Sequence, residues 1–195
     1  MKKNHLPLFI FMLLPMASLA ATAAEPVVAA QPAPQVPAVM SCDTHFPKDT
    51  KVIDSAIMES WATTAALQSF RFDPASIEPQ LLALKPCYTD QGWQGFNDAL
   101  KKSGNLDAIK SKQLVVSSQL GGKANLQAVK ENQWKITIPL QVIYQNTQQK
   151  ITQSLTVDLL VSRKASGDLG IMQLIAIPIK TAGAPAATRA VVTKP

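Results

Sequence analysis

The sequence predicts an α+β domain, with three N-terminal helices packed on one face of a curved antiparallel sheet of four to five strands. In the first half of the chain, apolar residues recur at three- and four-residue spacings, as they do along one face of a helix. After residue 112 they alternate with polar residues instead, which is typical of half-buried strands. With 195 residues, 47% of them hydrophobic, the chain can form one domain with a sizeable core.

Both ends of the chain are predicted to lie outside this domain. Residues 1–24 have the pattern of a secretory signal peptide: two lysines, then an apolar run, then small residues. Prolines interrupt the run, and it is shorter than the roughly 20 residues of a spanning helix, so we expect cleavage after Ala20, Ala23 or Ala24. The remaining sequence has no second apolar run of that length, which predicts a periplasmic protein without a transmembrane segment after cleavage.

The mature chain divides into three parts by composition. Residues 25–41 contain four prolines, many alanines and almost no charge, and are predicted to be an extended tether. Residues 42–180 hold the periodic segments and form the predicted domain. Residues 181–195 are again rich in alanine and proline and are predicted to be a disordered tail.

The two cysteines of the chain, Cys42 and Cys87, are predicted to form a disulfide. The periplasm is oxidising, and neither cysteine belongs to a CxxC redox motif. In the chain-entropy description, a bridge across this loop contributes about 3 to 4 kcal/mol to stability.

The first predicted helix covers residues 49–70, with Asp49 as its N-cap. Its apolar positions are Val52, Ile53, Ala56, Ile57, Trp61, Ala65 and Leu67. A second, shorter helix covers residues 76–84, with Ser76 as N-cap, and ends before Pro86. Its apolar positions are Ile77, Leu81, Leu82 and Leu84.

A third helix is predicted to begin at Thr89, its N-cap, and to place Trp93, Phe96 and Leu100 on one face. The residues 103–105 end it. Leu106 and Ile109 then give one more helical turn before the strands begin.

The predicted strands are residues 113–120, 124–130, 133–145, 149–163 and 170–179. Gly121 and Gly122 are expected to form a tight hairpin turn between the first two. The third has the clearest alternation, with Trp134, Ile136, Ile138, Leu140, Val142 and Tyr144 on one face. Pro139 lies within it and lacks a backbone donor, which indicates a bulge or an edge at that position. In the fourth, the inward positions are Ile151, Leu155, Val157, Leu159 and Val161.

Charge and motif content argue against most catalytic and nucleic-acid-binding classes. The formal charge of +6 falls by two, to +4, when Lys2 and Lys3 leave with the signal peptide. Such an excess does not require nucleic acid, and the seven lysines between residues 101 and 135 form either a solvated face or a surface for an acidic partner. The sequence has no P-loop, GxGxxG or HExxH motif, so we expect no cofactor.

Isolated residues that could carry chemistry have more ordinary interpretations. His45, the only histidine after residue 24, has only Asp43 near it in sequence, which is too little for a catalytic relay or a metal site. Asp158 is the only acid within a strand pattern, and alternation places it on the outer face of the sheet. Trp134 and Tyr144 share the apolar face of a strand and are expected in the core rather than in a stacking platform. We therefore expect no catalytic and no metal-binding residue.

The order of several motifs resembles the IcmL/DotI family of the type IVB (Dot/Icm) secretion system and its conjugation relatives. The resemblance begins with a Thr-x-x-Gly-Trp-x-x-Phe-x-x-Ala-Leu helix at residues 89–100. It continues through Asn105-Leu106, Lys110-Ser111-Lys112, Leu114-Val115-Val116, Trp134 before Pro139, Tyr144, Leu155-x-Val157, Arg163 and Gly170-Ile171-x-Gln173. These markers span roughly residues 49–180.

The resemblance implies a nuclear-transport-factor-2-like fold and a non-catalytic structural or assembly role, with other secretion-system subunits as partners in a large oligomeric assembly. Members of the family typically carry an uncleaved inner-membrane helix, whereas this chain has a predicted signal peptide and tether. An exported protein of this kind is expected in the periplasm, in the outer-membrane core complex. The alternatives are a soluble periplasmic binding module for a cell-wall fragment, a small ligand or a translocating effector, and an enzyme with a buried acid in a pocket.

Overall fold

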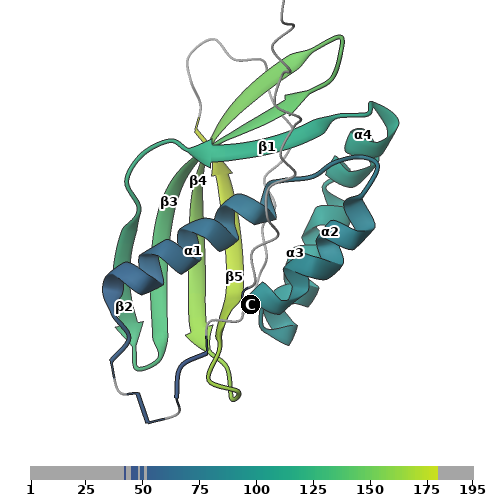
Figure 1. The fold of residues 1–195 in the computed structure, drawn as a ribbon. Coiled ribbons are helices and arrows are strands. Elements are labelled where there is room, and N and C mark those ends of the chain that lie inside the picture. Colours follow the sequence, from purple (N-terminus) through teal and green to yellow (C-terminus); the bar gives the residue numbers. More distant parts are fainter. Residues whose placement is uncertain (1–41, 43–44, 48, 51, 180–195) are drawn as a thin grey trace, which may run out of the picture. The chain divides into compact units, whose positions relative to one another are not determined.

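A computed structural model of the chain describes residues 42, 45–47, 49–50 and 52–179. The predicted signal peptide, tether and tail (residues 1–24, 25–41 and 181–195) lie outside the described residues. In chain order the elements are α1 (Ser55–Ser69), α2 (Ile77–Leu84), a 3₁₀ turn (Lys85–Cys87), α3 (Asp90–Lys102), α4 (Asn105–Ser111), β1 (Val115–Leu120), β2 (Asn125–Lys130), β3 (Gln133–Gln145), β4 (Lys150–Arg163) and β5 (Leu169–Pro178). This is the predicted α+β order, with four α-helices preceding one antiparallel sheet (Figure 1).

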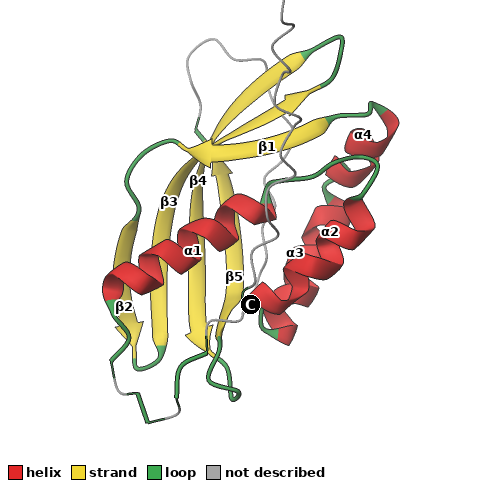
Figure 2. Cartoon of the chain, viewed as in Figure 1, coloured by secondary structure: helices red, strands yellow, loops and turns green. Residues whose placement is uncertain are grey.

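Helix α1 crosses one face of the sheet and contacts strands β1 to β4, while α3 packs against β5 (Figure 2). The residues that α1 buries share one face and are mostly small, which lets the helix lie close to the strands. They are Met58, Trp61, Ala62, Ala65, Ala66 and Ser69. No helix in the described part of the chain is long and apolar enough to cross a membrane.

The start of α1 differs from the prediction. The N-cap is Asp54, not Asp49: its carboxylate accepts hydrogen bonds from the backbone N–H groups of Ala56 (2.8 Å) and Ile57 (3.1 Å). Val52 precedes the helix and is 82% exposed, and the side chain of Ile57 is 48% exposed. The predicted apolar face was right at Ile53, Trp61 and Ala65, which are buried. It was wrong at Val52, Ala56 and Ile57, which are exposed, because alanines and a serine form most of the buried stripe.

The two following helices agree more closely with the sequence. Ser76 is at the N-cap of α2, as predicted, but its side chain makes no capping hydrogen bond. Leu82, predicted to be apolar contact surface, is 71% exposed because it lies on the outer side of this short helix. Thr89 caps α3 as predicted, and its hydroxyl accepts a hydrogen bond from the N–H of Gly92 at 3.0 Å. Gly104, at φ 72°, ends that helical segment in the left-handed region.

The sheet has the order β1-β3-β4-β5, and β2 also pairs with β3. Both β1 and β2 run antiparallel to β3: Leu120 pairs with Leu140, and Asn125 pairs with Thr137. They are therefore two successive pieces of one interrupted edge strand. The predicted hairpin at Gly121 and Gly122 is wrong. The chain does not reverse at these residues but continues in the same direction along β3.

The interruption has a physical cause in β3. The carbonyl of Pro139 accepts a hydrogen bond from the N–H of Gly121 at 2.8 Å, so this residue's backbone faces the edge strand. In an antiparallel ladder the N–H of the same residue would face the same way, and proline has none. The predicted bulge or edge at Pro139 is not found, because β3 is paired on both sides and its register with β4 is regular there. Pro139 instead lies opposite the break between β1 and β2.

The alternation predicted for the long strands is confirmed in their burial. Ile136, Ile138, Leu140 and Val142 of β3 are at most 1% exposed, and Leu155, Val157, Leu159 and Val161 of β4 are at most 4% exposed. These side chains face α1 and form the core. Ile151, predicted to face inward, is 42% exposed, because the β3–β4 hairpin extends beyond the region that the helices cover.

Candidate interaction surfaces

The N-terminal segment of the domain, which we call the entry strap (Cys42, residues 45–47 and residues 49–50), is fastened to the rest of the fold. Its first attachment is a disulfide between Cys42 and Cys87, the predicted pair, whose Cα atoms are 5.0 Å apart. Both cysteines are almost completely buried. The bridge fixes the strap beside the N-terminus of α3, since Cys87 precedes that helix by only a few residues.

The second attachment is the guanidinium group of Arg163, at the end of β4. It donates hydrogen bonds to the carbonyl oxygens of Thr50 (2.9 Å) and Phe46 (2.8 Å), and to that of Pro47. A planar guanidinium group can serve several acceptors at once, which an ammonium group does less well. In the sequence, Arg163 was noted only as one of the residues shared with the family. The structure shows that its side chain holds the strap against the end of β4.

The third attachment joins the strap to the turn between β4 and β5. Nδ1 of His45 lies 3.0 Å from Oδ1 of Asp168, and the N–H of Phe46 donates to the carbonyl of Gly167 at 3.2 Å. Hydrogen bonds from Ser166 and from His45 lower the pKa of Asp168. His45 is therefore paired with an acid 123 residues away, which its sequence neighbours gave no means to predict.

Tyr88 lies directly after the disulfide and at the centre of an aromatic cluster. Its ring stacks on Phe96 at 4.9 Å between centroids and meets Trp93 edge-on at 5.8 Å. Its hydroxyl lies 2.8 Å from Oγ of Ser69, which in turn donates to the carbonyl of Ala65. Because Ser69 has a single hydroxyl proton, Tyr88 is the donor in their bond. Burial raises the pKa of Tyr88 above its ordinary value.

These contacts make the Thr-x-x-Gly-Trp-x-x-Phe helix a core element, as expected for its aromatic residues. They also explain its glycine. An added Cβ on Gly92 would lie 2.0 Å from the carbonyl oxygen of Ile171 and 2.9 Å from that of Met172. The helix therefore rests directly on the backbone of β5, a contact that the backbone N–H of Thr89 strengthens by donating to Ile171 at 3.0 Å.

A small cavity lies between the helices and the sheet. It is lined by side chains that include Phe70, Phe96, Tyr144 and Leu174, and it has a volume of about 30 Å³. Ligand sites for small molecules usually have volumes of about 300 to 1,000 Å³, so this cavity can hold no more than about one water molecule. Tyr144 is partly buried against the core, as Trp134 is, in agreement with the expectation that neither forms a stacking platform.

The face of the sheet opposite α1 is covered less well. Asp158 lies on this face, as predicted. Its carboxylate accepts a hydrogen bond from the hydroxyl of Thr137 (2.6 Å) and forms an ion pair with Lys135 (3.1 Å). Next to this polar cluster, Leu160 and Ile175 are only half-buried. The face is thus mixed, with a satisfied carboxylate among aliphatic side chains.

The described residues offer little that could bind a metal ion. No group of three or more His, Cys, Asp and Glu side chains is gathered in the part of the chain that the structure describes. The only histidine there is held by Asp168, and both cysteines form the disulfide. The expectation of no catalytic or metal-binding residue remains a prediction.

Solved structures similar to this chain come from type IV secretion systems. An IcmL-like type IV secretion system protein from Legionella pneumophila matches with 22% identity and a TM-score of 0.64, covering 69% of this chain and 98% of that chain. The periplasmic domain of DotI matches with 28% identity and a TM-score of 0.63, covering 67% of this chain and 99% of that one. CagV, a VirB8 homolog from Helicobacter pylori, shares the fold at 8% identity and a TM-score of 0.52, covering 64% of this chain and 99% of that one.

No curated protein matches this chain. A family profile does, over residues 41–178, and that family is described as a type IVB secretion system, inner-membrane complex component. The match includes the disulfide, the strap, all four helices and all five strands. The chain therefore belongs to the DotI/IcmL family of type IVB secretion system components.

Proposed function

We propose that this protein is a periplasmic, non-catalytic structural subunit of a type IVB secretion system, associated with the outer-membrane core complex. The observation that carries the proposal is the family match over residues 41–178, which begins immediately before the strap. The similar domain of DotI is a periplasmic domain by its description, which supports the same compartment for this chain.

The proposal includes a division of the chain. Residues 1–24 are a cleaved signal peptide, residues 25–41 a tether, residues 42–180 the domain and residues 181–195 a flexible tail. A disulfide between buried cysteines suits an oxidising compartment, because cytosolic thiols are kept reduced. The predicted signal peptide in place of a membrane anchor is the reason for proposing the outer-membrane side of the complex.

The tests follow from these statements. Mass spectrometry of the mature protein should find its N-terminus after Ala20, Ala23 or Ala24. Alkaline carbonate should release the protein from isolated membranes, since no helix would anchor it. Purification of the secretion complex from cell envelopes should recover the chain at a reproducible stoichiometry, and its absence from that complex would refute the structural role.

The alternative is a soluble periplasmic binding module for a cell-wall fragment, a small ligand or a translocating effector. The cavity between helices and sheet, at about 30 Å³, is too small for a cell-wall fragment or a small ligand. A translocating effector could only bind on the outside of the domain. The binding-module alternative is therefore tested by identifying the molecules that contact the outer surfaces of the domain in the assembled complex.

A further inference from the structure

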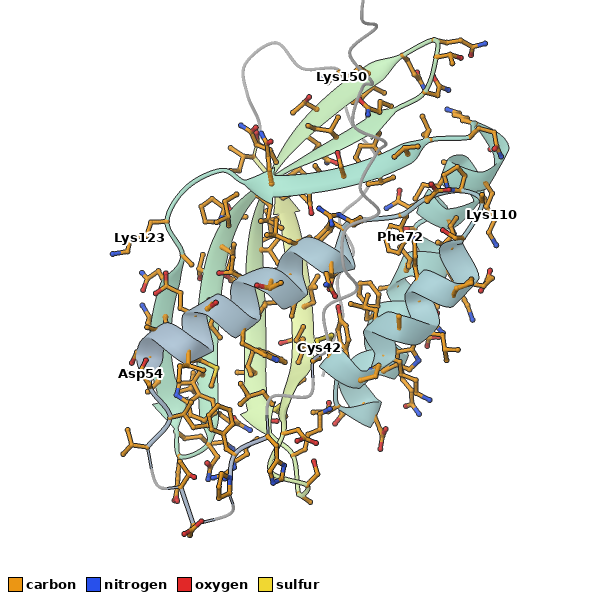
Figure 3. The ribbon with its side chains drawn as sticks, in the orientation of Figure 1. Cys42, Asp54, Phe72, Lys110, Lys123 and Lys150 are labelled. Carbon is orange, nitrogen blue, oxygen red and sulfur yellow. A yellow bond between two sulfur atoms is a disulfide. The ribbon has the colours of Figure 1, made fainter. Side chains whose placement is uncertain are left out.

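An open groove lies at the end of the domain where α4 leads into β1. The turn between β3 and β4 forms its other wall. Its volume is about 940 Å³, and it is lined by residues 111–113, Val115 and residues 145–149. Lys110 and Lys150 lie at this end of the domain, whereas Lys123 lies away from it in the β1–β2 connection (Figure 3).

Hydrogen bonds hold the two walls in place without a ligand. The side chain of Asn146 accepts from the N–H groups of Gln148 and Gln149, both at 2.9 Å, which fixes the β3–β4 turn. Its amide nitrogen donates to the carbonyl of Lys112 at 2.8 Å, which joins the turn to the end of α4. The groove is thus a preformed feature, and a partner would not have to order it.

The end of α4 contains an unusual residue for its position. Leu114 N–H donates to the carbonyl of Ile109 at 3.0 Å, the long-range bond of a Schellman motif, and the left-handed residue of that motif is Gln113, at φ 50°. Glycine is the usual residue there because a side chain costs about 1 kcal/mol in this conformation. The side-chain amide of Gln113 donates to the carbonyl oxygen of Lys110 at 2.7 Å, which satisfies an acceptor at the end of α4 and gives a local reason for glutamine here. Gln113 is also one of the residues that line the groove.

The groove has a small excess of positive charge, and Lys112 is the one charged residue in its lining. The segments that form it, residues 105–115 and 145–151, contain Lys110, Lys112 and Lys150 against one carboxylate, Asp107. Lys110 is already paired with Glu78 at 2.7 Å, but no ion pair is seen for Lys112 or Lys150 among the described residues. None of the residues that line the groove is acidic.

The remaining lining is rich in side-chain amides, from Gln113, Gln145, Asn146, Gln148 and Gln149. The amides of Asn146 and Gln113 already form hydrogen bonds within the domain. No side-chain hydrogen bond is seen for Gln145, Gln148 or Gln149 among the described residues, so the donors and acceptors of these three amides can match the alternating groups of an extended peptide backbone. Val115, in the lining, is 41% exposed and offers an apolar contact. None of the lining residues is aromatic, whereas sugar rings are usually held on aromatic faces, so a peptide suits this groove better than a glycan of the cell wall.

We propose that this groove binds an extended, acidic segment of another protein of the secretion assembly. The proposal rests on the structural role inferred above and names the chemistry of one partner. Lys112 and Lys150, for which no ion pair is seen among the described residues, would attract acidic residues and orient them, while the glutamine amides would pair with the partner's backbone.

A photo-crosslinking amino acid at Gln148, in the full chain and in intact envelopes, tests this directly. Mass spectrometry of the crosslinked peptide should identify an acidic segment of another protein. The double substitution Lys112→Glu and Lys150→Glu should lower the crosslink yield about tenfold, since two favourable pairs become repulsive. The matched control is Lys123→Glu with Lys130→Glu, which makes the same change of charge at exposed positions outside the groove and should preserve the yield.

Several results would overturn the proposal. These are a crosslink to a second copy of this chain, to cell-wall material or to a segment without acidic residues, no crosslink at all, or a yield that the groove substitutions leave unchanged. Recovery of the chain in the purified complex is scored separately. A chain that is present there but makes no acidic crosslink from Gln148 refutes the groove alone, whereas its absence from the complex refutes the structural role.

Discussion

Replacing Gly92 with alanine should destabilise the domain, because α3 leaves no room for a methyl group at this position. The new Cβ would lie 2.0 Å from the carbonyl oxygen of Ile171, a backbone atom that cannot rotate away. Overpacking of this kind costs about 1 to 3 kcal/mol. Moving the helix aside would also stretch the 3.0 Å bond from Thr89 N–H to Ile171, worth roughly 1 kcal/mol. The higher helix propensity of alanine returns about 0.5 to 1 kcal/mol, which leaves a net loss of about 1 to 3.5 kcal/mol.

The measurement is urea denaturation of the mature domain, followed by tryptophan fluorescence and circular dichroism. A loss of this size would also lower the melting temperature by about 10 °C for a domain of this length. Gly95→Ala, three residues further along α3, is the matched control, because it makes the same change in helix propensity at a half-buried position. If Gly92→Ala proved as stable as the parent protein, the direct packing of α3 on the backbone of β5 would be wrong.

Three further predictions concern the strap and the buried tyrosines. Reducing the Cys42–Cys87 bridge, or replacing both cysteines with alanine, should lower the free energy of unfolding by about 4 kcal/mol for a loop of 45 residues, and reductant should then have no further effect on the alanine variant. Arg163→Lys keeps the positive charge but loses the planar guanidinium group, so the free energy of unfolding should fall by about 1 to 3 kcal/mol. The amide hydrogen of Phe46 should then exchange faster, and protease should cut the strap sooner. Unchanged exchange would contradict the role of Arg163 in holding the strap. Burial raises the pKa of Tyr88 and Tyr144, so the folded state keeps protons that the unfolded chain loses above about pH 10. Stability should therefore fall as the pH rises above about 10, by at most about 1.4 kcal/mol per pH unit for each tyrosine. Tyr88→Phe should make that alkaline slope shallower, and an unchanged slope would show that Tyr88 does not contribute.

The sequence predicted the elements whose signals are local. The alternation of residues 133–145 predicted both ends of β3 correctly, and the Thr89 cap predicted the start of α3. Both signals depend on residues that are adjacent in the chain. The disulfide was also predictable, since only two cysteines exist and the compartment was inferred from the signal peptide.

The errors arose where long-range contacts decide. A pair of glycines between two strand patterns suits a hairpin, but here β3 supplies a longer partner for both strands, and Pro139 accounts for the break between them. The buried face of α1 was predicted only in part, because its buried stripe consists largely of small residues, whose weak hydrophobicity is outweighed in the pattern by exposed Val52 and Ile57. The strap contacts of His45 and Arg163 join residues more than 100 positions apart, and no local pattern encodes them.

The position of the disulfide also determines how the domain would carry mechanical load. A pull on the chain from its N-terminal side reaches the described fold first at Cys42, and the covalent bridge passes it to Cys87. From there it reaches Tyr88 and the contacts of Thr89 with the backbone of β5, bypassing α1 and α2. Tension would therefore act on β5, the strand at one edge of the sheet, and leave the first two helices unloaded. In the reduced protein the same tension would peel the hydrogen-bonded strap away and pull on the start of α1.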